Sequence, residues 1–260
     1  MGRIISVVSG KGGVGKSTVA LNLASALCSH YGRKVALVDL NLTTPHLAAM
    51  TGIAPRSLTL EDLLEGRASL CETLQPRAGI HLLPGSLSPK KLAGERLGRL
   101  GPVLRALRQN YDEVIIDAGP GLGKEAMLAM RYGDELLYVS TPTVPALIDV
   151  IRSRRAVGKL GKTHLGLVLN MVAADEAQLS RQQASAMAGL PVIASIPRDQ
   201  AVPKSLAAET PLTHFDQGSP ACRAFLMLGA DLCGKEYSPP DRLAGRQKTG
   251  LLGRILKLFR

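Results

Sequence analysis

The sequence predicts a doubly wound α/β domain, in which helices cover both faces of a mostly parallel sheet. Short apolar, β-branched runs recur along the chain, segments of helical character separate them, and a glycine-rich loop follows the first run. Continuous apolar runs are typical of strands that are buried on both faces, as in parallel sheets. Strands are expected at residues 4–8, 34–40, 80–84, 113–118, 135–140, 164–170 and 191–196.

Composition narrows the classes of protein to be considered. The chain has 260 residues, of which 45% are hydrophobic, so it can bury a full core. No apolar run approaches the roughly 18 to 20 residues that span a bilayer, and the N-terminus lacks a secretory apolar region. The four cysteines form no CxxC pair, so neither a disulfide framework nor a zinc motif is predicted. A cytoplasmic protein is therefore expected.

The loop after the first expected strand reads SGKGGVGKST over residues 9–18 and contains the GxxxxGK[ST] pattern of a phosphate-binding loop, or P-loop. Its glycines would let backbone amides close around phosphate oxygens. Lys16 is expected to reach the β- and γ-phosphates, and the Ser17 hydroxyl to ligate Mg²⁺. The expected nucleotide-binding residues of the loop are Gly10, Lys11, Gly12, Gly13, Val14, Gly15, Lys16, Ser17 and Thr18.

Lys11 is a second lysine, which the phosphate cradle itself does not need. The segment GKGGVGKS resembles the deviant Walker A motif of the MinD/ParA ATPases. The resemblance implies a P-loop NTPase fold, ATP and Mg²⁺ as cofactors, and an ATP-dependent homodimer in which Lys11 reaches the partner subunit's phosphates. The alternative for Lys11 is a solvated surface lysine.

The resemblance covers roughly residues 3–234. Residues 35–53 are similar to the family's switch I segment, and residues 111–123 to its Walker B and switch II segments. Further MinD-like segments are 136–155, 167–172 and 196–212.

Three further candidate positions lie at or just after the C-terminal ends of other expected strands. Asp117 ends an apolar run, where a carboxylate can hold Mg²⁺ through water beside the P-loop. The resemblance implies that Asn170 and Pro197 contact adenine. Their alternative roles are to cap a strand and to turn a corner.

One position departs from the family pattern. The family usually carries DxD after the second strand, and its second aspartate positions the attacking water; here Asp39 is present but Asn41 takes the second place. Asparagine can hold a water but lacks the charge that would polarise it. Slow hydrolysis is expected. The alternative is that Asp39, a switch II backbone group or an activating partner supplies the activation of water that Asn41 lacks. The expected catalytic residues are Lys11, Lys16, Asp39 and Asn41.

The C-terminal region differs in composition from the rest. The expected ATPase domain spans residues 1–237, followed by a flexible linker at 238–250 and an amphipathic helix at 251–260. Residues 241–260 hold six Lys or Arg against one Asp, in a chain of net charge +11. On a helical wheel Arg254 and Lys257 border an apolar face formed by Leu251, Leu252, Ile255, Leu256, Leu258 and Phe259. MinD proteins end in a similar membrane-targeting helix; the alternative is a helix docked on the protein's own core.

The leading hypothesis is a MinD-like ATPase that dimerises with ATP and whose C-terminal helix binds the anionic inner face of the cell membrane. There it would position regulatory or cargo proteins, in cell division or another spatial process. A ParA-like DNA partition ATPase is the alternative. Its basic candidates are Lys90, Lys91, Arg96, Arg99, Arg105, Arg108, Arg152, Arg154 and Arg155. An iron–sulfur carrier of the related Mrp type ranks below both, because Cys222 and Cys233 form no CxxC.

Overall fold

The structure is a computed structural model, and it describes residues 2–86, 97–158 and 160–238. Within these ranges eight strands form one sheet in the order β3-β4-β2-β5-β1-β6-β7-β8, in which every pair is parallel except β3 with β4. The strands are β1 Arg3–Val8, β2 Val35–Leu40, β3 Gln75–Arg77, β4 Ile80–Leu83, β5 Glu113–Ala118, β6 Glu135–Ser140, β7 Thr163–Val172 and β8 Val192–Pro197.

All seven expected strands are confirmed, and β3 is a strand that the sequence analysis did not predict. It is a three-residue edge strand with the sequence QPR, so it carries no apolar pattern. It pairs with β4 through a tight turn at Ala78 and Gly79, whose φ angles of 46° and 81° are both left-handed. Short edge strands next to such turns lack the buried runs on which strand prediction depends.

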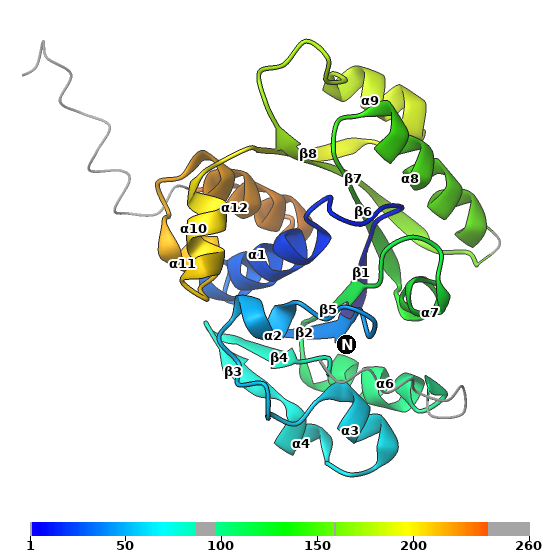
Figure 1. Ribbon diagram of the computed structural model, residues 1–260, viewed down its shortest axis with the longest axis vertical. Helices are drawn as coiled ribbons and strands as arrows, with labels where there is room; N and C mark the ends of the chain where they lie inside the picture. The colour runs from blue at the N-terminus through cyan, green and yellow to red at the C-terminus, as the bar shows by residue number, and fades with distance from the viewer. Residues whose placement is uncertain (1, 87–96, 159, 239–260) are drawn as a thin grey trace, which may run out of the picture.

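Helices cover both faces of the sheet, as expected for a doubly wound fold (Figure 1). One face is covered by α1 Lys16–Ser29, α2 Leu47–Met50, α10 Ala201–Ala207, α11 Leu212–Phe215 and α12 Pro220–Cys233. The other face is covered by α3 Leu60–Glu65, α4 Leu70–Thr73, α6 Leu100–Asn110, α7 Lys124–Tyr132, α8 Val144–Val157 and α9 Arg181–Ala188.

Each central strand contributes to two separate hydrophobic cores. In β1, Ile5 and Val7 belong to the core under α1 and α12, whereas Ile4 and Val8 belong to the core under α6, α7 and α8. Successive side chains of a strand point to opposite faces, so a strand covered on both sides must be apolar throughout. This is the physical reason for the continuous apolar runs in the sequence.

The last described helix, α12, ends at Cys233, shortly before the expected linker. Gly234 caps α12 with a left-handed φ of 63°. The chain then lies back against the end of α1, where the Lys235 ammonium donates to the Tyr31 carbonyl at 3.1 Å and a ring nitrogen of His30 lies 2.9 Å from the Ser238 carbonyl oxygen.

Several expected features lie outside the described residues. They are the linker after Ser238, the amphipathic helix at 251–260, and the basic residues Lys90, Lys91 and Arg96. Among the helices that are described, none combines the length and the apolar character needed to cross a bilayer.

Candidate nucleotide and magnesium site

The P-loop occupies the centre of the sheet, where β1 ends between β5 and β6 and α1 begins. Gly13 and Gly15 have φ angles of 81° and 82°, a left-handed conformation that glycine adopts without a Cβ penalty. Gly15 is also the N-cap of α1 and has no side chain to cap it. The positive end of the helix dipole therefore faces the loop, as in anion-binding helix termini.

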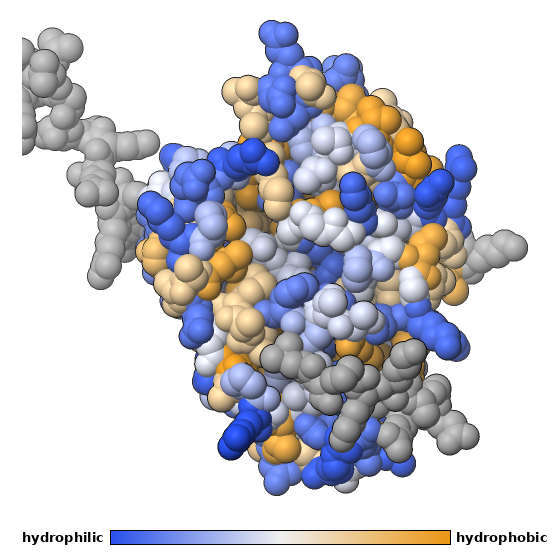
Figure 2. Space-filling model, in the orientation of Figure 1, coloured by the Kyte–Doolittle hydropathy of each residue, from blue (hydrophilic) through white to orange (hydrophobic). Residues whose placement is uncertain are grey.

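A cavity of about 540 Å³ lies over this loop. Its lining brings together much of the predicted site, from the P-loop, the segment after β2 and more distant segments. The lining residues are Ser9, Lys11, Gly12, Gly13, Val14, Gly15, Lys16, Ser17, Thr18, Asn41, Thr44, His46, Ala49, Met50, Pro120, Met171 and Leu206. On the face shown in Figure 2, residues of intermediate hydropathy cover the middle, where the loop after β1 lies in Figure 1.

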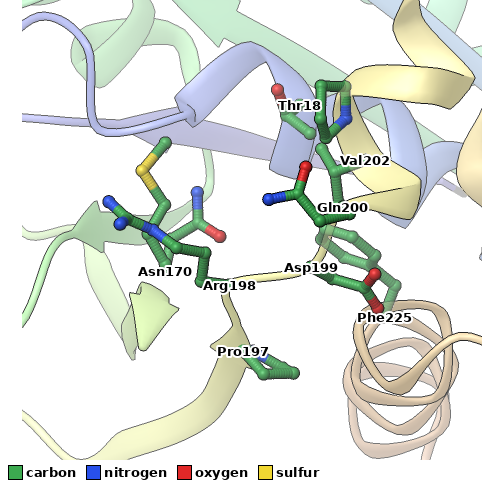
Figure 3. A pocket seen from close by; sticks show the side chains of 10 residues that line it. Thr18, Asn170, Pro197, Arg198, Asp199, Gln200, Val202 and Phe225 are labelled. Atoms are coloured by element: carbon green, nitrogen blue, oxygen red, sulfur yellow. The ribbon is translucent and has the colours of Figure 1, made fainter. Parts of the chain in front are cut away.

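A second cavity of about 300 Å³ shares Thr18 and Met171 with the first (Figure 3). Its other lining residues are Asn170, Pro197, Arg198, Asp199, Gln200, Val202, Pro203 and Phe225. The two predicted adenine contacts, Asn170 and Pro197, thus lie together beside the P-loop. Adjoining hollows of this size, one lined by a phosphate loop, fit a nucleotide whose base and phosphates occupy different compartments.

Lys16 and Asp117 form a buried ion pair beneath the P-loop. Lys16 is 6% exposed and Asp117 is fully buried, and the Lys16 ammonium donates to Oδ1 of Asp117. The other carboxylate oxygen, Oδ2, has no hydrogen-bond partner among the described residues. A buried carboxylate oxygen without a partner is costly unless a ligand supplies one.

Mg²⁺ fits this arrangement. The free Oδ2 of Asp117 can accept a hydrogen bond from metal-bound water. Ser17, which follows Lys16 in the loop and lines the larger cavity, carries a hydroxyl oxygen of the kind that Mg²⁺ prefers. Within the described ranges no three His, Cys, Asp or Glu side chains gather as a metal cage would require. A magnesium ion here would share its coordination with nucleotide phosphates and water, the usual arrangement for phosphate-bound Mg²⁺.

Asp39 lies beside Asp117 because β2 and β5 are neighbours in register. Its carboxylate is fully buried and accepts backbone hydrogen bonds from Asn41 at 3.2 Å and Leu47 at 3.1 Å. Burial first, and then the charge of Asp117, raise the pKa of Asp39 to about 8. The backbone hydrogen bonds and Lys16 act in the opposite direction, by stabilising the carboxylate.

The Asn41 side chain, expected to face the attacking water, lines the larger cavity but is bonded within its own loop. Its amide nitrogen donates to the Thr44 carbonyl at 2.6 Å, and its amide oxygen accepts from the Thr44 hydroxyl at 3.3 Å. A carboxylate could not make the first of these bonds, since it has no donor. The asparagine therefore braces the loop that follows β2.

Asn170 contacts the P-loop itself. Its amide nitrogen donates to the Val14 carbonyl at 2.8 Å, and a Cβ on Gly15 would lie 2.2 Å from that nitrogen. The next residue, Met171, has a left-handed φ of 57°, which is uncommon for a side chain of this size. This kink at the end of β7 places Met171 in the lining of both cavities, and no local sequence signal predicted it.

Gly10 is the predicted loop residue that lines neither cavity. A Cβ on it would lie 2.2 Å from the backbone carbonyl carbon of Asp149 in α8. The glycine is required because α8 packs directly on the loop at this point. The nearby backbone bond from Gly121 to the Ser9 carbonyl, at 2.9 Å, ties the segment after β5 to the same loop.

Sequence reasoning missed several residues around the cavities. His46, Met50 and Leu206 line the larger one, and Gln200 and Phe225 the smaller one. His46 and Met50 lie in the segment similar to switch I, and Gln200 and Leu206 in the MinD-like segment 196–212, but none was singled out as a site residue. The packing of distant segments brings them to the cavities.

Four of the arginines considered for DNA binding are engaged within the protein. Arg152 forms an ion pair with Asp149 at 3.3 Å. Arg108 forms an ion pair with Asp134 at 3.1 Å, Arg154 donates to the Ala188 carbonyl at 3.0 Å, and Arg99 donates to the Leu64 carbonyl at 3.3 Å. Each of these contacts limits the availability of the side chain for a phosphate backbone.

Comparison with known proteins agrees with this geometry. Residues 5–212 match the family described as the CobQ/CobB/MinD/ParA nucleotide binding domain. An uncharacterised ATP-binding protein of Methanocaldococcus jannaschii is 31% identical over 254 residues, covering 97% of this chain and 95% of that protein.

Two solved structures share the fold at similar identity. The cell division ATPase MinD of Pyrococcus furiosus matches with a TM-score of 0.81 and 33% identity, over 90% of this chain and 99% of that one. MinD of Pyrococcus horikoshii, solved in complex with Mg-ADP, also has a TM-score of 0.81, with 32% identity over 96% and 100% of the two chains. The chain therefore belongs to the MinD/ParA family of P-loop ATPases, and within that family it is MinD-like.

Proposed function

We propose that this protein is an ATP-dependent dimerisation switch that binds the membrane in its ATP state and positions partner proteins there. The observation that carries the proposal is the contrast between the two lysines of one loop. Lys16 is buried and paired with Asp117, whereas Lys11 is exposed and lines the same cavity. A lysine at the outer edge of a phosphate site can serve a nucleotide bound to a second subunit.

The surface around Lys11 supports dimerisation. Leu122, Val144 and Ile148 are exposed by 44%, 47% and 41%. They belong to the segment after β5 and to α8, which both contact the P-loop. Exposed apolar side chains on segments that surround a site are typical of a protein-binding surface.

Hydrolysis by this protein is proposed to be slow. Asn41 supplies no charge, and its amide is bonded to Thr44. Asp39 is buried, and its pKa, raised to about 8, leaves it largely protonated near neutral pH in the nucleotide-free protein, so it is a poor acceptor for the proton of the attacking water. Both its oxygens also accept backbone hydrogen bonds. Slow hydrolysis would prolong the life of the ATP-bound dimer.

Membrane binding would depend on the amphipathic sequence at 251–260 and would place the protein at the inner face of the cell membrane. A helix of about ten residues is marginal alone in water, so one copy should bind weakly. Two copies on one dimer would bind far more tightly, because the second binds at high effective concentration. In this way ATP binding would control membrane attachment.

Sedimentation with anionic liposomes tests the proposal. The full chain and a chain ending at Tyr237 are compared, each with Mg-ADP and with Mg-ATP. We expect ATP-enhanced pelleting of the full chain and none of the shorter one. A control at low and high salt with neutral liposomes separates charge attraction from apolar insertion.

Absence of pelleting with either nucleotide would contradict the membrane switch. In that case salt-sensitive DNA binding that survives removal of residues 238–260 would favour the ParA-like alternative.

A further inference from the structure

We propose that Glu125 is a positioning residue for ATP hydrolysis, which holds the loop of residues 41–47 in place through Thr43. This inference rests on the proposed function. Its basis is a contact between the loop after β2 and the start of α7. The cavity is lined on one side by Asn41, Thr44 and His46 of that loop, and on the other by Pro120 of the segment that precedes α7.

The contact has well-defined geometry. The Thr43 hydroxyl donates to Oε1 of Glu125 at 2.8 Å, and the Thr43 backbone amide lies 3.4 Å from Oε2. Glu125 lies in the first turn of α7, which follows the segment after β5. Its carboxylate also occupies the space beside Gly119, where an added Cβ would come within 2.9 Å of Oε2. Gly119 therefore leaves room for the Glu125 carboxylate to reach Thr43.

The other hydrogen bonds of this loop join it to residues that are close in sequence, such as the bond from the Met50 amide to the His46 carbonyl at 2.9 Å. The Asp39 carboxylate accepts from the backbone amides of Asn41 and Leu47, and the Asn41 side chain donates to the Thr44 carbonyl. Among the hydrogen bonds of the described residues, the pair from Thr43 to Glu125 connects the loop to a separate element. It joins the segment after β2 to the helix after β5.

Positioning matters here because the loop has no charged group to offer an attacking water. Asn41 is neutral, so its effect on water depends on where the amide lies, and misplacement by about 1 Å can cost up to about 100-fold in rate. Lys16 and the P-loop amides, by contrast, bind phosphate independently of Thr43. Loss of the contact should therefore lower kcat and leave KM and ATP affinity nearly unchanged.

A purely structural role for Glu125 must be distinguished from this one. An acidic residue in the first turn of a helix also interacts favourably with the helix dipole. Thr43→Val removes the hydroxyl without touching α7, whereas Thr43→Ser keeps it. If only the dipole matters, Glu125→Ala will act on thermal stability alone and Thr43→Val will have no effect.

The experiment measures phosphate release with Mg-ATP, the Kd of ATP by calorimetry, and Tm, all in the full chain. We expect Thr43→Val and Glu125→Ala each to lower kcat by about tenfold, with KM and Kd within about twofold of the unchanged protein. Thr43→Ser should restore the rate. The double variant should be no slower than either single variant, since both remove one interaction.

Two results would overturn the inference: normal kcat in Thr43→Val, or independent, multiplying losses in the double variant. Failure of the proposed function would look different. The unchanged protein would then fail to bind or hydrolyse ATP, whatever residue stands at position 43. Hydrogen exchange of residues 41–47 gives a readout besides activity, and it should quicken in Thr43→Val but not in Lys124→Ala, a matched change on α7.

Discussion

Two glycines of the P-loop differ sharply in their surroundings. A Cβ on Gly10 would collide with the Asp149 backbone at 2.2 Å, while a Cβ on Gly12 would meet Pro120 at 4.0 Å, an ordinary contact distance. We expect Gly10→Ala to destabilise the nucleotide-free protein by about 2 kcal/mol or more and Gly12→Ala by less than about 0.5 kcal/mol. Thermal unfolding of the two variants checks this. Equal Tm values would show that α8 can move away from the added methyl group without loss of stability.

A second prediction at the residue scale concerns Asn41. Asn41→Asp restores a carboxylate at this position, so it should raise the rate of hydrolysis by about tenfold or more. It also removes the donor to the Thr44 carbonyl and adds a negative charge near buried Asp39, so stability should fall by about 1 kcal/mol. Phosphate release and urea unfolding measure both effects. An unchanged rate would mean that another group already activates the water.

At the scale of elements, the pairing of β2 with β5 makes stability depend on pH. It places Asp39 beside Asp117, and burial followed by that charge raises the pKa of Asp39 to about 8. In the unfolded chain the value is about 3.9. The native protein therefore holds a proton that the unfolded chain releases, so this contribution to stability is full below about pH 4 and is lost as pH rises towards 8.

We therefore expect the free energy of unfolding of the nucleotide-free protein to fall between pH 5 and pH 8, and to fall less steeply in Asp39→Asn. Urea titrations across this range measure the slope, and the comparison of the two slopes isolates the contribution of Asp39. Parallel slopes in the two proteins would show that Asp39 keeps an ordinary pKa.

At the scale of the whole molecule, the two lysines should separate nucleotide binding from assembly. Lys11 is exposed, so Lys11→Ala should leave Tm and ATP affinity unchanged yet abolish the ATP-dependent dimer. Lys16→Ala should lose ATP binding, and it should also destabilise the protein by about 3 kcal/mol or more because Asp117 would remain buried without its cation. Sedimentation velocity with Mg-ATP gives the readout. Lys124→Ala is the matched exposed control, and a dimer that survives Lys11→Ala would contradict the proposed role.

Local sequence patterns were sufficient to predict much of the fold and the centre of the candidate site. The strands were predictable because burial on both faces demands continuous apolar runs, and β2 is a nearly pure example, with Asp39 as its single polar residue. The P-loop was predictable because its glycines, Lys16 and Ser17 are consecutive, and phosphate binding by backbone amides is a local property. Strand β3 escaped because an exposed edge strand carries no such run.

Only the tertiary structure could decide the contacts between residues that lie far apart in the sequence. The Asn170 amide donates to the Val14 carbonyl, and Gly10 leaves room for the backbone of α8. Glu125 accepts a hydrogen bond from Thr43, which follows a different strand. Parallel strands bring their carboxyl ends to one edge of the sheet whatever their separation along the chain. The types of residue at those ends could be seen in the sequence, but their partners depend on strand order and register, which no local pattern encodes.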